Sequence, residues 1–261
     1  MRALDIAATG MEAQQMRVEV ISNNLANMNT TAYNPRRAEF ADLHYQQIRQ
    51  PGTVNASNGA VLPAGVQLGL GVIPVAVAAE VSQGSLRQTG GQLDLAIEGA
   101  GYLEVTLPSG LSAYTRDGAL KRTGDGLIVT SEGFPVIPDI TIPDDTRSIT
   151  INADGDVIAA FDDQVDTQIL GRFTLVNFAN EKGLEAIGGN LFLETTASGA
   201  ADIGDAGTDG RGRFRQGFLE ESSVDAVREI TELIEAQRGY EMNAKVITAA
   251  DQMLGATVQI R

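Results

Sequence analysis

Apolar residues recur every seven positions at both ends of the chain, and this spacing constrains its fold more than any other feature. The seven-residue spacing places such side chains along one side of a helix. We therefore expect a helix over about residues 4–28 with a single apolar seam. The seam comprises Leu4, Met11, Val18 and Leu25, with Ala7, Ile21 and Met28 beside them.

A second seam lies at the other end, where steps of three and four residues alternate. A helix of about 25 residues with one exposed apolar seam is marginally stable alone and requires a partner surface. Each terminal helix is the expected partner of the other, so residues 1–30 plus 222–261 are predicted to form a helical core. The second seam comprises Ala226, Ile230, Leu233, Gln237, Tyr240, Ala244, Ile247, Asp251, Leu254 and Val258.

Polar residues interrupt the seams at Gln14, Gln237 and Asp251. Buried polar groups of this kind specify register and partner choice in helical assemblies, at some expense of stability. The pattern therefore leaves two roles open. In the first, the seams pack solely against each other within one chain. In the second, they also bind copies of the same chain in a polymer.

The middle of the chain has the pattern of a mainly-β domain. Apolar alternation favours strands over 72–81, 93–97, 103–107, 149–151 and 173–178. Turn signals fall between them at Asp117-Gly118, Gly124-Asp125-Gly126, Glu132-Gly133 and Asp154-Gly155. We expect an α+β protein in which residues 72–194 form an acidic β domain inserted between the helices.

The remaining residues, 31–71 plus 195–221, are predicted to connect these parts. Residues 36–50 fit either a short helix or a strand. Residues 51–71 are rich in Gly, Pro, Ser and Asn, and their Asn58-Gly59 pair marks a possible hairpin turn within what is otherwise a linker composition. Residues 195–213 lack an apolar pattern and are expected to form the return link.

Charge is distributed unevenly along the chain. Residues 1–50 hold five basic and five acidic groups and residues 211–261 hold seven and eight, whereas residues 51–210 hold seven and twenty-one. Near-neutral ends can pack beside identical neighbours, while an acidic middle keeps copies apart. The balance also argues against nucleic acid as a partner, because phosphate binding requires a basic face.

Candidate chemical sites in the sequence are weak. His44 is the only histidine and there is no cysteine, which excludes thiolate chemistry and multi-histidine metal sites. Residues 152–156 are explained better by a tight hairpin than by a calcium loop, and Gly99-Ala100-Gly101 by a turn between strands. We expect no catalytic residue, cofactor or metal. The competing class is a periplasmic or cell-wall enzyme with a helical oligomerisation stalk.

Targeting signals are also weak. The first 17 residues contain acids and glutamines where a signal peptide requires an apolar run, so no cleaved signal is expected. No run of eighteen apolar residues occurs, and we predict no membrane insertion.

One segment carries a family resemblance: ISNNLANMNTTAY, residues 21–33, resembles the N-terminal signature shared by bacterial flagellar rod and hook proteins. Residues 83–105, 114–138 and 222–254 are similar to the same family in the same order. Length and closing helix are most similar to distal rod members, with proximal rod and hook-type axial proteins as alternatives. Ala32 stands where glycine is frequent in the family, and Tyr102 where phenylalanine is common.

The resemblance implies a structural subunit that polymerises into a rigid hollow shaft and transmits torque from motor to hook. Implied partners are further copies of the chain, proximal rod proteins, the hook protein, the surrounding ring proteins and the flagellar type III export apparatus. The implied location is the periplasm-spanning rod of the basal body, with the acidic β domain of residues 72–194 facing outward from the shaft. Residues 46–66 are implied to be an ordered extension that packs between subunits.

The predicted subunit interface combines this signature and extension with the helical seams. It consists of Leu4, Met11, Val18, Ile21, Asn24, Leu25, Asn27, Leu62, Val66, Ile230, Leu233, Gln237, Tyr240, Ala244, Ile247 and Leu254.

Overall fold

The computed structural model describes residues 2–50, 64–161 and 167–259. The chain divides into two compact units, each made of segments distant in sequence. Residues 1–26, 36–79 and 225–261 form the first, here called the helical unit. Residues 27–35 and 80–224 form the second, here called the β unit.

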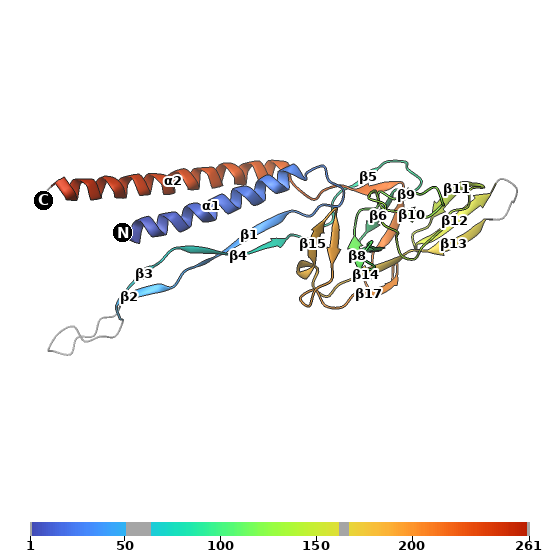
Figure 1. Cartoon of the computed structure of the whole chain (residues 1–261), viewed down its shortest axis with the longest axis horizontal. Coiled ribbons are helices and arrows are strands. Elements are labelled where there is room, and N and C mark those ends of the chain that lie inside the picture. The colour runs from blue at the N-terminus through green and yellow to red at the C-terminus, as the bar shows by residue number, and fades with distance from the viewer. Residues whose placement is uncertain (1, 51–63, 162–166, 260–261) are drawn as a thin grey trace. The chain divides into compact units, whose positions relative to one another are not determined.

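Two antiparallel helices dominate the helical unit (Figure 1). Helix α1 spans Arg2–Ala26 and helix α2 spans Ala226–Gln259, and they pack along each other. Asp225 caps α2, since its Oδ1 accepts hydrogen bonds from the backbone N–H groups of Val227 at 3.0 Å and Arg228 at 3.3 Å. The packing of α1 along α2 confirms the predicted pairing of the terminal helices. No helix among the described residues is both long enough and apolar enough to span a membrane.

A two-stranded antiparallel ribbon completes the helical unit. Strand β1 (Arg36–Asp42) pairs with β4 (Val72–Ala79), and β2 (Tyr45–Arg49) pairs with β3 (Val66–Gly69). Helix α1 packs on β1 and β4. At Gly71, with φ of 126°, the backbone passes so close to the Thr9 hydroxyl that a larger residue would be strained and would displace the Thr9 side chain. The ambiguous segment 36–50 is therefore strand, not helix.

The β unit consists of short antiparallel strands. β15, β16, β8 and β7 form a four-stranded sheet in that order, and β11, β12 and β13 form a three-stranded one. Its strands are β5 (Leu86–Gln88), β6 (Leu95–Glu98), β7 (Leu103–Thr106), β8 (Ser112–Thr115), β9 (Lys121–Arg122), β10 (Ile128–Val129), β11 (Thr146–Ile151), β12 (Asp156–Phe161), β13 (Gln168–Arg172), β14 (Thr174–Asn177), β15 (Glu185–Gly188), β16 (Leu191–Leu193), β17 (Asp202–Asp205), β18 (Arg213–Gln216) and β19 (Phe218–Glu220), with a 3-10 turn at Glu181–Gly183.

Residues 195–221 differ from the expected return link. Strands β17, β18 and β19 pair with β14, β6 and β5, so this segment closes the β unit by joining its last strands to its first. Residues 36–79 likewise belong to the helical unit, because β1 and β4 pair with each other and pack on α1. The unit boundaries thus lie elsewhere than the sequence pattern indicated.

The turns of the β unit agree with the sequence. Residues 152–156 form the tight turn of the β11–β12 hairpin, with Gly155 at φ of 91°. Beneath such turns lies a core of side chains that includes Leu95, Ile97, Leu103, Val105, Ile128, Val136, Val157, Phe173 and Leu175.

Candidate subunit interface

Small residues allow α1 and α2 to approach closely. A Cβ at Gly10 would lie 2.7 Å from the Asn243 side chain, and one at Gly239 would lie 3.1 Å from that of Gln14. Ala236 and Ala250 are the buried apolar residues of α2 among its described side chains. The contact is therefore a close-packed seam of small side chains, which dispersion contacts stabilise in proportion to how tightly they fit.

The predicted seam residues divide into two groups. Ile21 is buried, while Leu4, Met11, Val18, Leu25, Leu233, Ala244, Ile247 and Leu254 are half-buried in the helical unit. Ile230 is 46% exposed and Tyr240 is 44% exposed, and Gln237 is exposed as well. The second group lies outside the intramolecular seam and remains accessible.

Sequence reasoning missed the small residues of this seam. Ala236 and Ala250 each lie one position before a residue of the predicted stripe, and alanine carries little hydrophobic signal. The available signal was the pair of glycines, Gly10 and Gly239, because a glycine inside a helix generally has a packing reason.

Asn24 joins three elements of the helical unit. Its side chain is 2% exposed. Its Nδ2 donates to the Arg36 carbonyl at 2.9 Å and to Glu229 Oε2 at 3.2 Å, and its Oδ1 accepts from the Arg36 N–H at 2.9 Å. The end of α1 is thus held to the first residue of β1 and to the first turn of α2. Asn27, also predicted, is half-buried and its backbone carbonyl accepts from Thr30 N–H at 3.1 Å in the β unit.

Ion pairs supplement the helix contact. Arg17 lies 3.4 Å from Glu232 and 3.8 Å from Glu235, measured between nitrogen and carboxylate oxygen. Arg228 also contacts Glu232, at 3.2 Å. Partial burial acts to raise the pKa of Glu232, but the hydrogen bonds from Arg228 and Arg17 outweigh it and hold the pKa below its ordinary value.

The ribbon exposes large apolar side chains along its whole described length. Val75 is 63% exposed, and Tyr45, Ile48, Val66, Leu68, Ile73 and Val77 are exposed as well. A two-stranded ribbon with so little burial is marginal in water unless another surface covers it. Val66 is thus accessible, as an interface residue must be. The predicted interface residue Leu62 and the Asn58-Gly59 turn lie outside the described residues.

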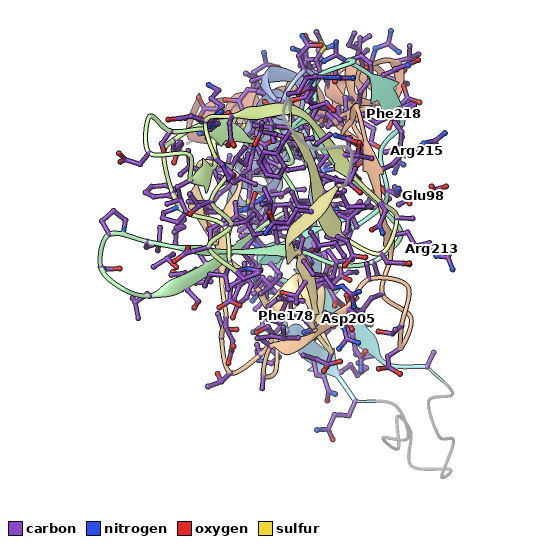
Figure 2. The ribbon with its side chains drawn as sticks, turned by 90° about the vertical axis from the view of Figure 1, so that its right-hand side faces the viewer. Glu98, Phe178, Asp205, Arg213, Arg215 and Phe218 are labelled. Carbon is purple, nitrogen blue, oxygen red and sulfur yellow. The ribbon has the colours of Figure 1, made fainter. Side chains whose placement is uncertain are left out.

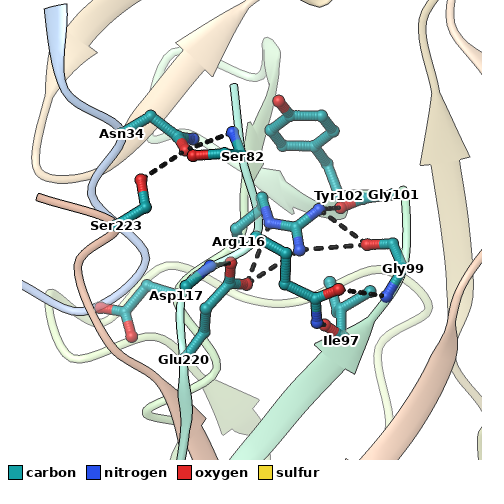
Figure 3. A network of polar contacts seen from close by, with 12 residues as sticks. Asn34, Ser82, Ile97, Gly99, Gly101, Tyr102, Arg116, Asp117, Glu220 and Ser223 are labelled. Atoms are coloured by element: carbon teal, nitrogen blue, oxygen red, sulfur yellow. Dashed lines mark hydrogen bonds and ion pairs between the residues drawn. The ribbon is translucent and has the colours of Figure 1, made fainter. Parts of the chain in front are cut away.

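A buried ion pair holds the β unit together (Figure 3). Arg116 NH2 lies 2.8 Å from Glu220 Oε2, and both side chains are almost fully buried. Arg116 also donates to the carbonyls of Gly99 and Gly101, each at 3.1 Å, while Glu220 Oε1 accepts from Gly84 N–H at 2.9 Å. Every described polar group of the pair thereby gains a partner, which is what a buried pair requires to be tolerated.

The outer face of β18 carries exposed cations (Figure 2). Arg215 lies over the Phe218 ring, 4.3 Å from its centroid, and 3.9 Å from Glu98. Arg213 is paired with Glu98 across the β18–β6 ladder. His44, by contrast, is exposed between β1 and β2. These arrangements position charges on a surface and do not form a catalytic cluster.

The helix pair and the ribbon expose apolar side chains, which is typical of a structural protein that assembles with others. Three family models match the chain. "Flagella basal body rod protein" matches residues 4–33, "Flagellar hook protein FlgE/F/G D1 domain" residues 96–159, and "Flagellar basal body rod FlgEFG protein C-terminal" residues 215–260.

Comparison with full-length relatives also identifies flagellar proteins as similar to this chain. The chain is 53% identical to the flagellar basal-body rod protein FlgG of Caulobacter vibrioides, with 100% of each chain covered. It is 51% identical to that of Agrobacterium fabrum, over 97% of each chain. It is 33% identical to the flagellar hook-basal body complex protein FlhP of Bacillus subtilis, again over 100% of each. The chain belongs to the flagellar basal-body rod protein family, and it is a non-enzymatic structural protein.

Proposed function

We propose that this protein is a structural subunit of the distal rod of the bacterial flagellar basal body. In this role copies of the chain polymerise into a rigid hollow shaft that transmits torque from the motor to the hook. The observation that carries the proposal is the exposed apolar surface of the helical unit, in a chain that matches flagellar basal-body rod proteins from end to end.

Two surfaces of the helical unit serve polymerisation in this proposal. The first is the exposed side of α2 at Ile230, Gln237 and Tyr240. The second is the β1–β4 and β2–β3 ribbon, including Val66. The buried seam residues, such as Ile21 and Asn24, act indirectly by holding these surfaces in place. A contact between two different surfaces that does not close on itself generates an open helical filament.

The proposal extends to partners and location. Proximal rod proteins and the hook protein bind the two ends of the shaft, and ring proteins surround it where it crosses the periplasm. The subunit reaches its site through the flagellar type III export apparatus. The uneven charge supports this arrangement, since near-neutral ends suit the crowded axis of a tube and an acidic middle suits its outside.

Electron microscopy of basal bodies from a strain that lacks this protein tests the proposal. We expect the inner rod to remain and the outer rod and hook to be absent, and expression of the intact chain should restore both. Loss of the whole rod would instead support a proximal rod subunit. A complete rod without a hook would support a hook-type axial protein.

A further inference from the structure

A shallow groove lies between α1 and α2 about halfway along the helix pair. Its volume is about 400 Å³, and its lining is Gln15, Val18, Glu19, Gln237, Tyr240 and Glu241. Val18 and Tyr240 give it apolar area, and both of its charged lining residues are acidic. A groove of this composition suits an apolar helix face that carries basic residues.

The acidic character continues along the exposed side of α1. Asp5, Glu12 and Glu19 are spaced seven residues apart and are all exposed. Residues seven apart lie on one side of a helix, about 10 Å from each other along its axis. None of the three forms an ion pair within the part of the chain that the structure describes.

Helix α2 presents a complementary face on the side turned away from α1. Val227, Ile230 and Ile234 are 75%, 46% and 45% exposed, and their spacing of three and four places them on one side of the helix. Arg238 and Lys245 continue the same side, again seven residues apart. Across the described residues, these two cations have no carboxylate within ion-pair distance, whereas Arg17 and Arg228 do.

We infer that the groove and acidic side of α1 in one copy receive the Val227–Lys245 face of α2 from a second copy. Glu12 and Glu19 then pair with Arg238 and Lys245, since both pairs of residues have the same spacing. Charged positions flanking an apolar contact select partners in helical assemblies in this way. The two surfaces differ, so the contact joins copies head to tail and can repeat without limit.

This inference rests on the proposed function, because it assigns one of the contacts by which the subunits polymerise. It uses residues that the intramolecular seam leaves accessible. Charge selects a second copy as the occupant: the chain carries both the acidic receptor and the basic ligand, each without an ion-pair partner of its own within the described residues.

Charge reversal in pairs tests the inference on the full-length purified chain. One variant carries Arg238→Glu with Lys245→Glu, and the other carries Glu12→Lys with Glu19→Lys. Each variant alone should raise the protein concentration needed for filament formation at least tenfold, as measured by sedimentation and electron microscopy. An equimolar mixture should polymerise near the wild-type concentration, because every acidic α1 can then meet a basic α2 and every basic α1 an acidic α2.

The control is Lys121→Glu with Lys182→Glu, which makes the same change of charge as Arg238→Glu with Lys245→Glu, but at exposed positions of the β unit. This variant should polymerise like wild type, and circular dichroism should show unchanged helix content in all variants. Wild-type filament formation by the reversed variants, or failure of their mixture, would overturn the inference while leaving the proposed function intact. Absence of filaments from the wild-type chain would count against both.

Discussion

The Asn24 amide forms with Arg36 the two hydrogen bonds that a neighbouring strand would otherwise form with that residue. Both the Arg36 N–H and its carbonyl lie 2.9 Å from the Asn24 side chain, and the same amide nitrogen contacts Glu229. The last turn of α1 therefore substitutes for a strand at the start of the ribbon. No other side chain of similar size offers a donor and an acceptor in this geometry.

Replacement of Asn24 should destabilise the helical unit. Asn24→Ala leaves the Arg36 backbone groups without their partners, and we expect a loss of about 2–4 kcal/mol in the free energy of unfolding. Thermal unfolding followed by circular dichroism at the helix band measures it. Ser22→Ala, at an exposed position of the same helix, should change stability by less than about 0.5 kcal/mol. Equal stability of the two variants would contradict the role assigned to Asn24.

The Arg116–Glu220 pair gives a corresponding prediction for the β unit. Arg116→Met should cost about 3–5 kcal/mol, because it leaves the Glu220 carboxylate buried without its cation. Hydrogen exchange measured by mass spectrometry should accelerate across β5, β6 and β19. Arg87→Met, which removes an exposed pair with Glu221, should cost less than about 1 kcal/mol. Unchanged exchange in Arg116→Met would show that the pair does not hold these strands together.

Ala32 adopts a left-handed conformation, with φ of 54°, and its N–H donates to the Glu220 carbonyl at 2.9 Å. Alanine is strained there and a β-branched residue more so. Ala32→Gly should stabilise the β unit by up to about 1 kcal/mol, because relief of strain outweighs the small loss of buried methyl and chain entropy. Ala32→Val should destabilise it by about 2 kcal/mol. Denaturant unfolding of the two variants should therefore shift in opposite directions.

Acid should weaken the contact between the helices. The pKa of Glu232 is held below its ordinary value of 4.5 in the folded protein, so its contribution is complete above that value and disappears as pH falls through the folded-state pKa. Glu232→Gln should lower the melting temperature of the helical unit at pH 6 and have progressively less effect toward pH 3. Glu241→Gln is the control, because Glu241 is exposed and forms no ion pair within the described residues; this variant should change the melting temperature little at either pH. An effect of Glu232→Gln that persists at pH 3 would point to lost packing instead of lost charge.

Two neighbouring positions on α2 should separate folding from assembly. Leu233 is half-buried beside α1, whereas Ile230 is largely exposed. Leu233→Asp should unfold the helical unit and leave the β unit intact, since a buried charge without a partner costs several kcal/mol. Ile230→Asp should leave the unfolding free energy of the monomer within about 0.5 kcal/mol of wild type and still abolish swimming in a motility assay. Normal swimming with Ile230→Asp would exclude this side of α2 from the interface.

Much of the fold follows from the local sequence. Seven-residue spacing predicted both helices, and alternation with Asp-Gly turns predicted strands such as β4 and β7. The face by which α2 contacts α1 could not be predicted. The apolar stripe of α2 is wide, and the sequence does not show which edge of it packs against α1 and which stays exposed. Ile230 and Tyr240 have the stronger hydrophobic signal, yet the closer approach is at Ala236 and Gly239.

Long-range pairing accounts for most of the remainder. Arg116 and Glu220 are separated by 104 residues, and no local pattern connects them. β17 is Asp-Ile-Gly-Asp, which has low intrinsic strand preference and forms because β14 offers it a free edge. For the subunit interface, the sequence predicts only that the terminal helices carry apolar surface. Which part of that surface remains exposed depends on how the two helices pack.

The pairing of α1 with α2 also has a consequence for protein synthesis. The first 26 residues leave the ribosome long before Ala226–Gln259 are translated. Helix α1 can therefore pair with α2 only after translation has passed α2. A chain that terminates before residue 226 can still contain every strand of the β unit, yet it has no second helix. Truncated products therefore lack α2 and cannot complete the helix pair. The order of the elements thereby limits completion of the helical unit to chains that are translated through α2.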